Sequence, residues 1–137
     1  MKIFTKLSFA TLPLLFAGNV LALDLSETVL CASLDVHECV DGVGCNEVLA
    51  ESVNAPTFFR VDLENEQLRI TKSGDPTEVE HYERIAGRVI MQGVDAARQD
   101  AEQGVGWTVA IEEETGRMVA TATIDQGAVV IFGACTE

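Results

Sequence analysis

The sequence has few basic residues: nine lysines and arginines stand against 22 aspartates and glutamates in 137 residues, for a formal net charge of −13. Nucleic-acid binding depends on a cationic surface that displaces the counterions of the phosphates. We therefore expect no nucleic-acid partner. The deficit is larger after residue 22, because Lys2 and Lys6 precede it, and the remaining 115 residues carry seven bases, 22 acids and a formal charge of −15.

The sequence also lacks the common catalytic motifs. It contains no G-x-S-x-G, no H-E-x-x-H and no glycine-rich phosphate loop. The two histidines, His37 and His81, have carboxylates mainly as sequence neighbours, and neighbours on a strand point to opposite faces. Nothing in the sequence favours an enzyme, so we name no catalytic residue and expect no cofactor.

A long apolar run occurs only near the start of the chain. Lys2 and Lys6 accompany the apolar residues 7–18, and residues 20–22 (Val-Leu-Ala) place small side chains where a signal peptidase reads them. The run is short for a bilayer span, and acidic residues follow it. We predict a signal peptide over residues 1–22, its cleavage, and a soluble chain that is periplasmic or secreted and not embedded in a membrane.

All four cysteines lie after residue 22, and an even number in a short exported chain predicts two disulfides. Cys39 and Cys45 flank a turn sequence, Asp-Gly-Val-Gly at 41–44, which favours a bond between them. Cys31 and Cys135 then lie in the first and last β-like segments, which favours the second bond. That long loop would stabilise the fold by about 4 kcal/mol. The alternative is a four-thiolate zinc site, but C-x2-C spacing is absent.

Apolar and polar residues alternate with a period of two through most of the remaining chain, which predicts strands. The clearest case is residues 57–63, where Phe59, Val61 and Leu63 share one face. Similar patterns predict strands at 28–36, 46–52, 67–72, 79–82, 88–92, 107–111, 118–124 and 128–135, separated by turn sequences at 38–44, 64–66, 73–76, 114–116 and 125–127. Residues 94–103 form the one plausible helix, or else a polar loop.

About eight short strands with turns every 8–12 residues predict a single β domain over residues 23–137. We expect a small antiparallel meander that forms a closed or nearly closed β-barrel, lipocalin-like in plan, with a β-sandwich as the alternative. A bond between Cys31 and Cys135 would place the first and last strands side by side, as barrel closure requires. The last strand is apolar on both faces, so an outward Val129 and Ile131 would need cover, which residues 94–103 could supply.

Several short motifs occur together: Glu38-Cys39 with Gly44-Cys45, Pro-Thr-Phe-Phe-Arg-Val-Asp at 56–62, Gly106-Trp107, and Ile-Phe-Gly-Ala-Cys at 131–135. In this combination the chain resembles a group of small, uncharacterised exported bacterial proteins, over nearly the whole predicted domain. The resemblance implies a shared fold and compartment and transfers no activity. In plan the chain is also similar to the small periplasmic β-barrel inhibitors of lysozyme, but their Tyr-x-Cys opening is absent at Cys31.

Aromatic and acidic residues are the candidates for binding. Phe58 is expected outside the main core, because it points away from Phe59, and Trp107 stands at the start of a strand. Three consecutive acids, Glu112, Glu113 and Glu114, precede a hairpin glycine. Asp35, Glu38, Asp41, Asn46 and Glu47 could offer oxygen ligands to calcium, but they do not follow a calcium-loop register, so we expect no dedicated metal site.

These observations predict a protein-interaction module, a monomer that binds a cationic envelope or secreted partner, with an inhibitor as one form. The acidic surface would steer such a partner. The alternative is a small-molecule carrier that uses the barrel interior. The predicted inward side chains are bulky enough to fill that interior, which favours the first function.

Overall fold

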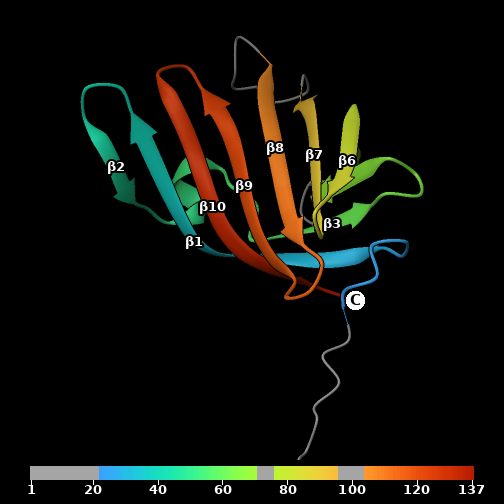
Figure 1. Ribbon diagram of the computed structural model, residues 1–137. Helices are drawn as coiled ribbons and strands as arrows, with labels where there is room; N and C mark the ends of the chain where they lie inside the picture. The colour runs from blue at the N-terminus through green and yellow to red at the C-terminus, as the bar shows by residue number, and fades with distance from the viewer. Residues whose placement is uncertain (1–21, 71–75, 96–103) are drawn as a thin grey trace, which may run out of the picture.

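The alternating pattern produces ten strands in the computed structural model, which describes residues 22–70, 76–95 and 104–137 (Figure 1). Most of the predicted signal peptide, residues 1–21, lies outside the described residues. The elements are β1 (Val29–Val40), β2 (Gly44–Glu47), the short 3-10 helix η1 (Ala50–Val53), β3 (Phe58–Asp62), β4 (Gln67–Ile70), β5 (Pro76–Glu78), β6 (His81–Ile85), β7 (Arg88–Asp95), β8 (Val105–Glu112), β9 (Arg117–Ile124) and β10 (Gly127–Thr136). Within these ranges, no helix is long and apolar enough to cross a membrane.

All the strands belong to one antiparallel sheet, in the order β5-β4-β3-β1-β10-β9-β8-β7-β6, with β2 paired to the second half of β1. The sheet curls into a half-barrel (Figure 1). The predicted all-β antiparallel meander is confirmed, and the described strands do not divide into the two sheets of a sandwich. The first and last strands, β1 and β10, are neighbours over ten paired positions.

The two outer strands of the sheet, β5 and β6, are consecutive in the chain. At their junction the backbone N–H of Val79 donates to the carbonyl of Glu66, which precedes β4, at 2.8 Å. The next N–H, of Glu80, donates to the carbonyl of Gln92 on β7 at 3.0 Å. The chain thus crosses from one edge of the curled sheet to the other at residues 79–80.

Both predicted disulfides are present. Cys31 and Cys135 are paired positions of β1 and β10, and their bond joins the first strand to the last. Cys39 and Cys45 are paired positions of β1 and β2, on either side of the turn. Two disulfides are typical of an oxidising, extracytoplasmic environment.

The core lies on the concave side of the sheet, where aliphatic side chains from most strands are buried. Val129 and Ile131 belong to it, at 3% and 5% exposure. The expectation that they face outward and need cover is therefore wrong. Because both faces of β10 are apolar, its sequence does not show which face is inward.

Two local predictions also need correction. The strand expected at 46–52 ends at Glu47, and Ala50–Val53 form η1, which terminates at Asn54 in the left-handed conformation (φ 52°). The start of the helix predicted over 94–103 is wrong, because Val94 and Asp95 are the last residues of β7. The rest of that segment, 96–103, and most of the predicted turn at 73–76 lie outside the described residues.

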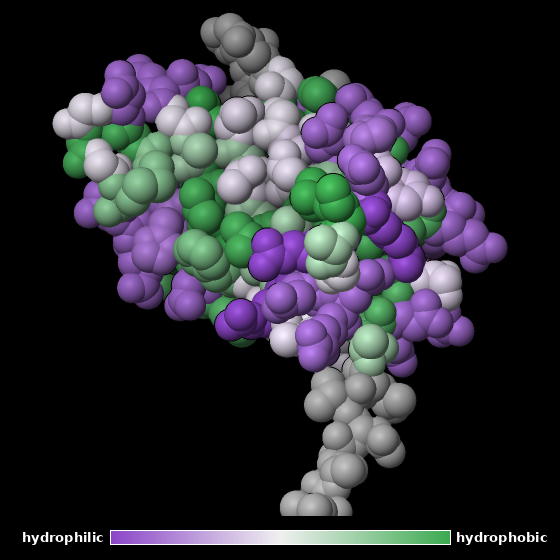
Figure 2. Space-filling view, in the orientation of Figure 1, coloured by the Kyte–Doolittle hydropathy of each residue, from purple (hydrophilic) through white to green (hydrophobic). Residues whose placement is uncertain are grey.

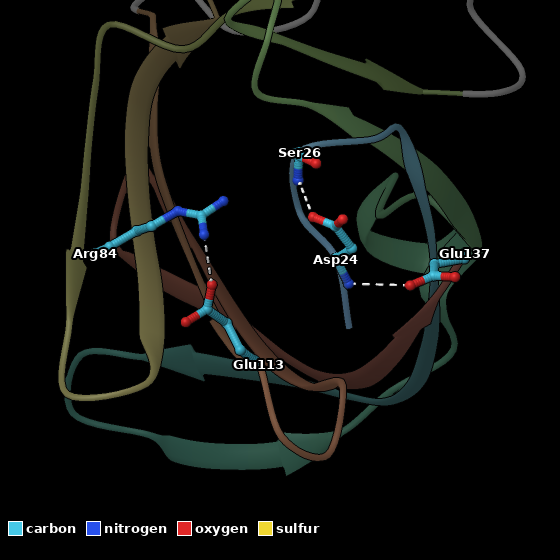
Figure 3. Close-up of polar contacts among 5 residues, drawn as sticks. All are labelled: Asp24, Ser26, Arg84, Glu113 and Glu137. Carbon is cyan, nitrogen blue, oxygen red and sulfur yellow. Dashed lines mark hydrogen bonds and ion pairs between the residues drawn. The ribbon is translucent and has the colours of Figure 1, made fainter. Parts of the chain in front are cut away.

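The segment before β1 closes one end of the half-barrel. Its backbone is held by two bonds: the N–H of Leu23 donates to the carbonyl of Glu113 at 2.7 Å, and the N–H of Asp24 donates to Oε1 of Glu137 at 3.0 Å. Figure 3 shows Asp24 inside the ring of strands, with Glu137 on one side and Glu113 on the other. Leu25 follows and is almost fully buried in the core.

Candidate functional site

A row of exposed apolar side chains crosses the convex face of the sheet. Phe132 of β10 is paired with Val119 of β9, which is paired with Ala110 of β8, which is paired with Ile90 of β7. Leu34 of β1 extends the row beside Phe132. The four larger side chains are each 38–68% exposed, and these five residues are called the apolar row below.

Leu34 reaches this face through an irregularity in β1. The pairing of β1 with β10 shifts between Ser33 and Asp35, which leaves Leu34 as the extra residue of a β-bulge. Ser33 is anchored on the other side, because its N–H donates to the carbonyl of Thr57 at 2.9 Å and its hydroxyl to the carbonyl of Pro56 at 2.6 Å. The bulge adds Leu34 to the rim of a shallow groove of about 460 Å³ that Val119 and Phe132 also line.

The apolar row is bordered by two rows of different character. On one side the paired positions run from His37 through Val130, Thr121 and Thr108 to Gln92, which makes that border mostly polar. The imidazole of His37 stands edge-on to the ring of Phe132, with the ring centroids 5.8 Å apart. In Figure 2, green side chains cross the surface over β10, β9 and β8 between paler and purple ones.

On the other side the border is charged, with Glu112 between Arg117 and Arg88. The carboxylate of Glu112 lies 3.6 Å from Nε of Arg117 and 3.9 Å from a terminal guanidinium nitrogen of Arg88. It also accepts a hydrogen bond from the hydroxyl of Thr115 at 2.7 Å. This bond first, and the two arginines after it, hold the pKa of Glu112 below its usual range.

The three predicted acidic residues thus have different surroundings. Glu112 belongs to the charged border, and Glu113 forms an ion pair with Arg84 of β6 at 2.9 Å (Figure 3). Glu114 is exposed on the hairpin loop. Because two of the three carboxylates face arginines of this chain, the structure gives them a local electrostatic role and does not bring the three together into one site.

A large part of the chain beside the apolar row carries no base. Residues 22–59 contain seven aspartates and glutamates and neither lysine nor arginine. They include the β1–β2 hairpin, which the bond between Cys39 and Cys45 holds together. The residues considered as possible calcium ligands lie along this hairpin. Among the described residues, no three His, Cys, Asp or Glu side chains form a group that could hold a metal ion.

The concave side contains a second feature, a half-open pocket of about 90 Å³. Its lining is mostly apolar and includes Trp107, Val109 and Ala122, with Asp95 and Thr77 among the few polar residues. The interior is therefore filled along most of the sheet but hollow at this end. The indole nitrogen of Trp107 is buried and has no hydrogen-bond partner among the described residues. An unpaired buried donor of this kind costs about 1–3 kcal/mol.

The predicted aromatic candidates lie on opposite faces. Trp107 lines the concave pocket. Phe58 is 46% exposed on β3, where it is paired with Ala32 of β1 and points outward, since its neighbour Phe59 is buried in the core.

The apolar row was not predicted at all, because it depends on which residues of five strands are paired. The one local signal for it was that Val119 and Phe132 alternate along their strands with the residues that face inward.

No protein-family model, no curated protein and no solved structure matches the chain. The resemblance to small exported bacterial proteins therefore stays a prediction, and the function has to be argued from the surfaces described above.

Proposed function

We propose that this protein is an exported interaction module whose convex face binds a cationic protein or peptide. The observation that carries the proposal is the apolar row, in which side chains of adjacent strands lie at paired positions and remain exposed. An exposed apolar patch that polar residues surround is typical of a protein interaction site. The row has the anatomy of a binding surface, with an apolar centre and polar or charged borders.

The charge of the surrounding chain supports a cationic partner. Leu34 lies within the base-free residues 22–59, so one end of the row adjoins a hairpin whose charges are all negative. Such a field accelerates encounter with a basic partner and repels acidic ones. The bulk charge of the chain, −13, acts in the same direction. An inhibitor of a basic secreted enzyme is one form that this function would take.

The compartment belongs to the same proposal. The predicted signal peptide over residues 1–22 would export the chain to the periplasm or the medium, where the two disulfides can form. The exported chain would act there as a monomer that exposes its convex face.

The test is to immobilise the exported chain and challenge it with the extracytoplasmic extract of the cells that make it. We expect retention of a basic protein at about 50 mM salt and its release at about 300 mM salt, because screening weakens the attraction. F132D, which places a charge in the centre of the row, should weaken binding by at least about tenfold.

V94D is the matched control, because Val94 is a comparably exposed aliphatic residue of β7 that does not belong to the row. It should leave binding nearly unchanged. Equal loss in F132D and V94D would show that binding does not depend on the apolar row, because Val94 shares the convex face but lies outside the row, and a retained protein that is acidic would contradict the cationic partner.

A further inference from the structure

We infer that the open edge of β2 is a docking site for a basic, extended segment of a partner protein, which would add to the sheet as one more strand. This edge is distinct from the convex face, and the inference rests on the proposed function in one respect, the cationic nature of the partner. Three features of the edge define the partner segment: its outward backbone groups, the charge around it, and the aliphatic side chains at its two ends.

The strand β2 is an edge strand. It pairs with the second half of β1, and among the described strands none pairs with its other side (Figure 1). All four of its residues, Gly44–Glu47, are exposed. The bond between Cys39 and Cys45 fastens it to β1. An edge of this kind presents backbone N–H and C=O groups to which another strand can bind.

The pairing with β1 shows which backbone groups of β2 point outward. The N–H of Val48 donates to the carbonyl of Val36 at 2.9 Å, so these two residues form a hydrogen-bonded pair. Hydrogen-bonded and non-hydrogen-bonded pairs alternate along an antiparallel ladder. Glu47 and Cys45, which lie one and three positions before Val48, are therefore in non-hydrogen-bonded pairs. Their N–H and C=O groups point away from β1, toward the open edge.

Two further distances agree with this assignment. The Cα atoms of Cys39 and Cys45 are 4.0 Å apart. That distance is closer to the separation of about 4.5 Å in a non-hydrogen-bonded pair than to the 5.5 Å of a bonded one. On the other side of β1, the N–H of Asp41 donates to the carbonyl of Gln126 at 2.9 Å, so Cys39, two positions earlier, directs its backbone groups to β10. The open edge thus offers two donors and two acceptors, those of Cys45 and Glu47.

The charge around the edge selects a cationic segment. Residues 35–51, from the bulge of β1 to the start of η1, contain five aspartates and glutamates and neither lysine nor arginine. The side chain of Glu47 lies on the convex side of β2, because its pair His37 contacts the ring of Phe132 on that face. A lysine or arginine opposite Glu47 on an added strand would form a cross-strand ion pair. A second copy of this chain would bring the same acidic hairpin and be repelled.

Exposed aliphatic side chains lie at both ends of β2. Val43 precedes the strand and Leu49 follows it, at 73% and 75% exposure. Both could contact aliphatic residues of an added strand, and burial of this surface would stabilise the complex. The partner segment is therefore an extended run of about seven residues in which cationic and aliphatic side chains alternate with the period of a strand.

The probe is the peptide acetyl-Val-Lys-Val-Lys-Val-Lys-Val-amide, and the reporters are the backbone amide resonances of β2 in the ¹⁵N-labelled exported chain. At about 50 mM salt, where screening is weak, we expect the amide protons of Cys45 and Glu47 to move downfield in a saturable manner as they gain acceptors. The amide of Asn46, which points to β1, should move less. The same peptide with methyl groups on its three central backbone nitrogens keeps its charge and loses those donors, and it should not saturate.

Two substitutions of Glu47 separate the backbone contribution from the charge. E47Q removes the carboxylate and keeps the N–H, and it should weaken peptide binding by about threefold. E47P also removes the outward N–H, a change that an edge strand tolerates, and should weaken binding by about tenfold. E114Q removes the same charge from the exposed hairpin loop between β8 and β9 and should bind like the parent chain. Should E47P fail to fold, the methylated peptide supplies the same comparison.

Saturation by the methylated peptide would overturn the inference. Shifts of the same amides that grow with protein concentration and need no peptide would also overturn it, because a second copy would then be the occupant. The peptide titration involves no protein from the extract, so the two proposals fail separately. If the extract yields no basic protein and the peptide saturates, the edge site stands; if a basic protein is retained and the peptide does not saturate, the edge site alone is wrong.

Discussion

Gly93 of β7 and Trp107 of β8 are paired across the sheet, and a Cβ atom on Gly93 would lie 2.5 Å from Cζ2 of the indole. The same Cβ would lie 2.6 Å from the carbonyl oxygen of Glu78. The indole therefore packs directly on the backbone of β7, which is possible only where the strand has no side chain. Trp107 also lines the concave pocket.

G93A should displace the indole and destabilise the protein. The added methyl group meets both the ring and a carbonyl oxygen, and overpacking of this kind costs about 1–3 kcal/mol. The free energy of unfolding in denaturant measures the loss, and the emission of Trp107 should change at the same time. G106A is the control, because the nearest atom to its Cβ would be the hydroxyl oxygen of Thr123 at 3.5 Å, an ordinary contact. Equal destabilisation in both variants would contradict the argument.

The two disulfides should differ in their contribution to stability. Cys31 and Cys135 are separated by 104 residues in the sequence, whereas Cys39 and Cys45 are separated by six. In the chain-entropy account, loss of the long cross-link costs about 4–5 kcal/mol and loss of the short one about 2 kcal/mol. The double variants C31A/C135A and C39A/C45A, compared by chemical unfolding, test this difference. Similar losses in the two would show that loop length does not govern the effect.

Leu25 should contribute to the core although it lies outside every strand. It is almost fully buried, at 1% exposure, so L25A should lower the free energy of unfolding by about 2–4 kcal/mol. Leu23, two residues earlier, is only partly buried and packs at the margin of the core. L23A should therefore cost clearly less. If both variants unfold like the parent chain, the segment before β1 is not part of the cooperative unit.

The charged border of the convex face should make stability depend on pH in acid. The hydroxyl of Thr115 and the guanidinium groups of Arg117 and Arg88 lower the pKa of Glu112 from its ordinary value of 4.5. Because the folded pKa is the lower one, the stabilisation is complete above the unfolded value and disappears as the pH falls through the folded value.

E112Q should therefore be less stable than the parent chain at about pH 6, and the difference should shrink toward about pH 3. Unfolding curves across this interval measure it. E114Q is the control, because no ion pair is found for Glu114 in the described part of the chain. A difference between E112Q and the parent chain that is constant with pH would contradict the electrostatic cause.

Local pattern was sufficient for much of the fold. The alternation of Phe59, Val61 and Leu63 predicted which face of β3 is buried, and all three are in the core. The even number of cysteines and the turn at residues 41–44 predicted both disulfides. The positive φ of Gly116, 68°, lies at the end of the predicted hairpin loop. Each of these features depends on residues close in sequence, or on one cross-link that joins the two ends of the domain.

Pairing between distant strands decided the rest. The bond between Cys31 and Cys135 predicted that β1 lies beside β10. No local pattern indicates that β3 lies on the other side of β1, or that a bulge at Leu34 adds a side chain to the row formed by Phe132 and Val119. The same limit applies to β10, whose inward face could not be chosen while both faces were apolar.

The candidate sites, too, were predicted in part from local pattern and depend in part on strand pairing. Trp107 and Phe58 could be named from the sequence as aromatic residues with uncommon placement, but not assigned to the concave and the convex face. The sequence by itself determined the β architecture, the covalent framework and the acidic charge, because alternation, cysteine number and composition are properties of the chain. Only the tertiary structure decided the apolar row and the pocket at Trp107, because each is assembled from side chains that come together through the register of five or more strands.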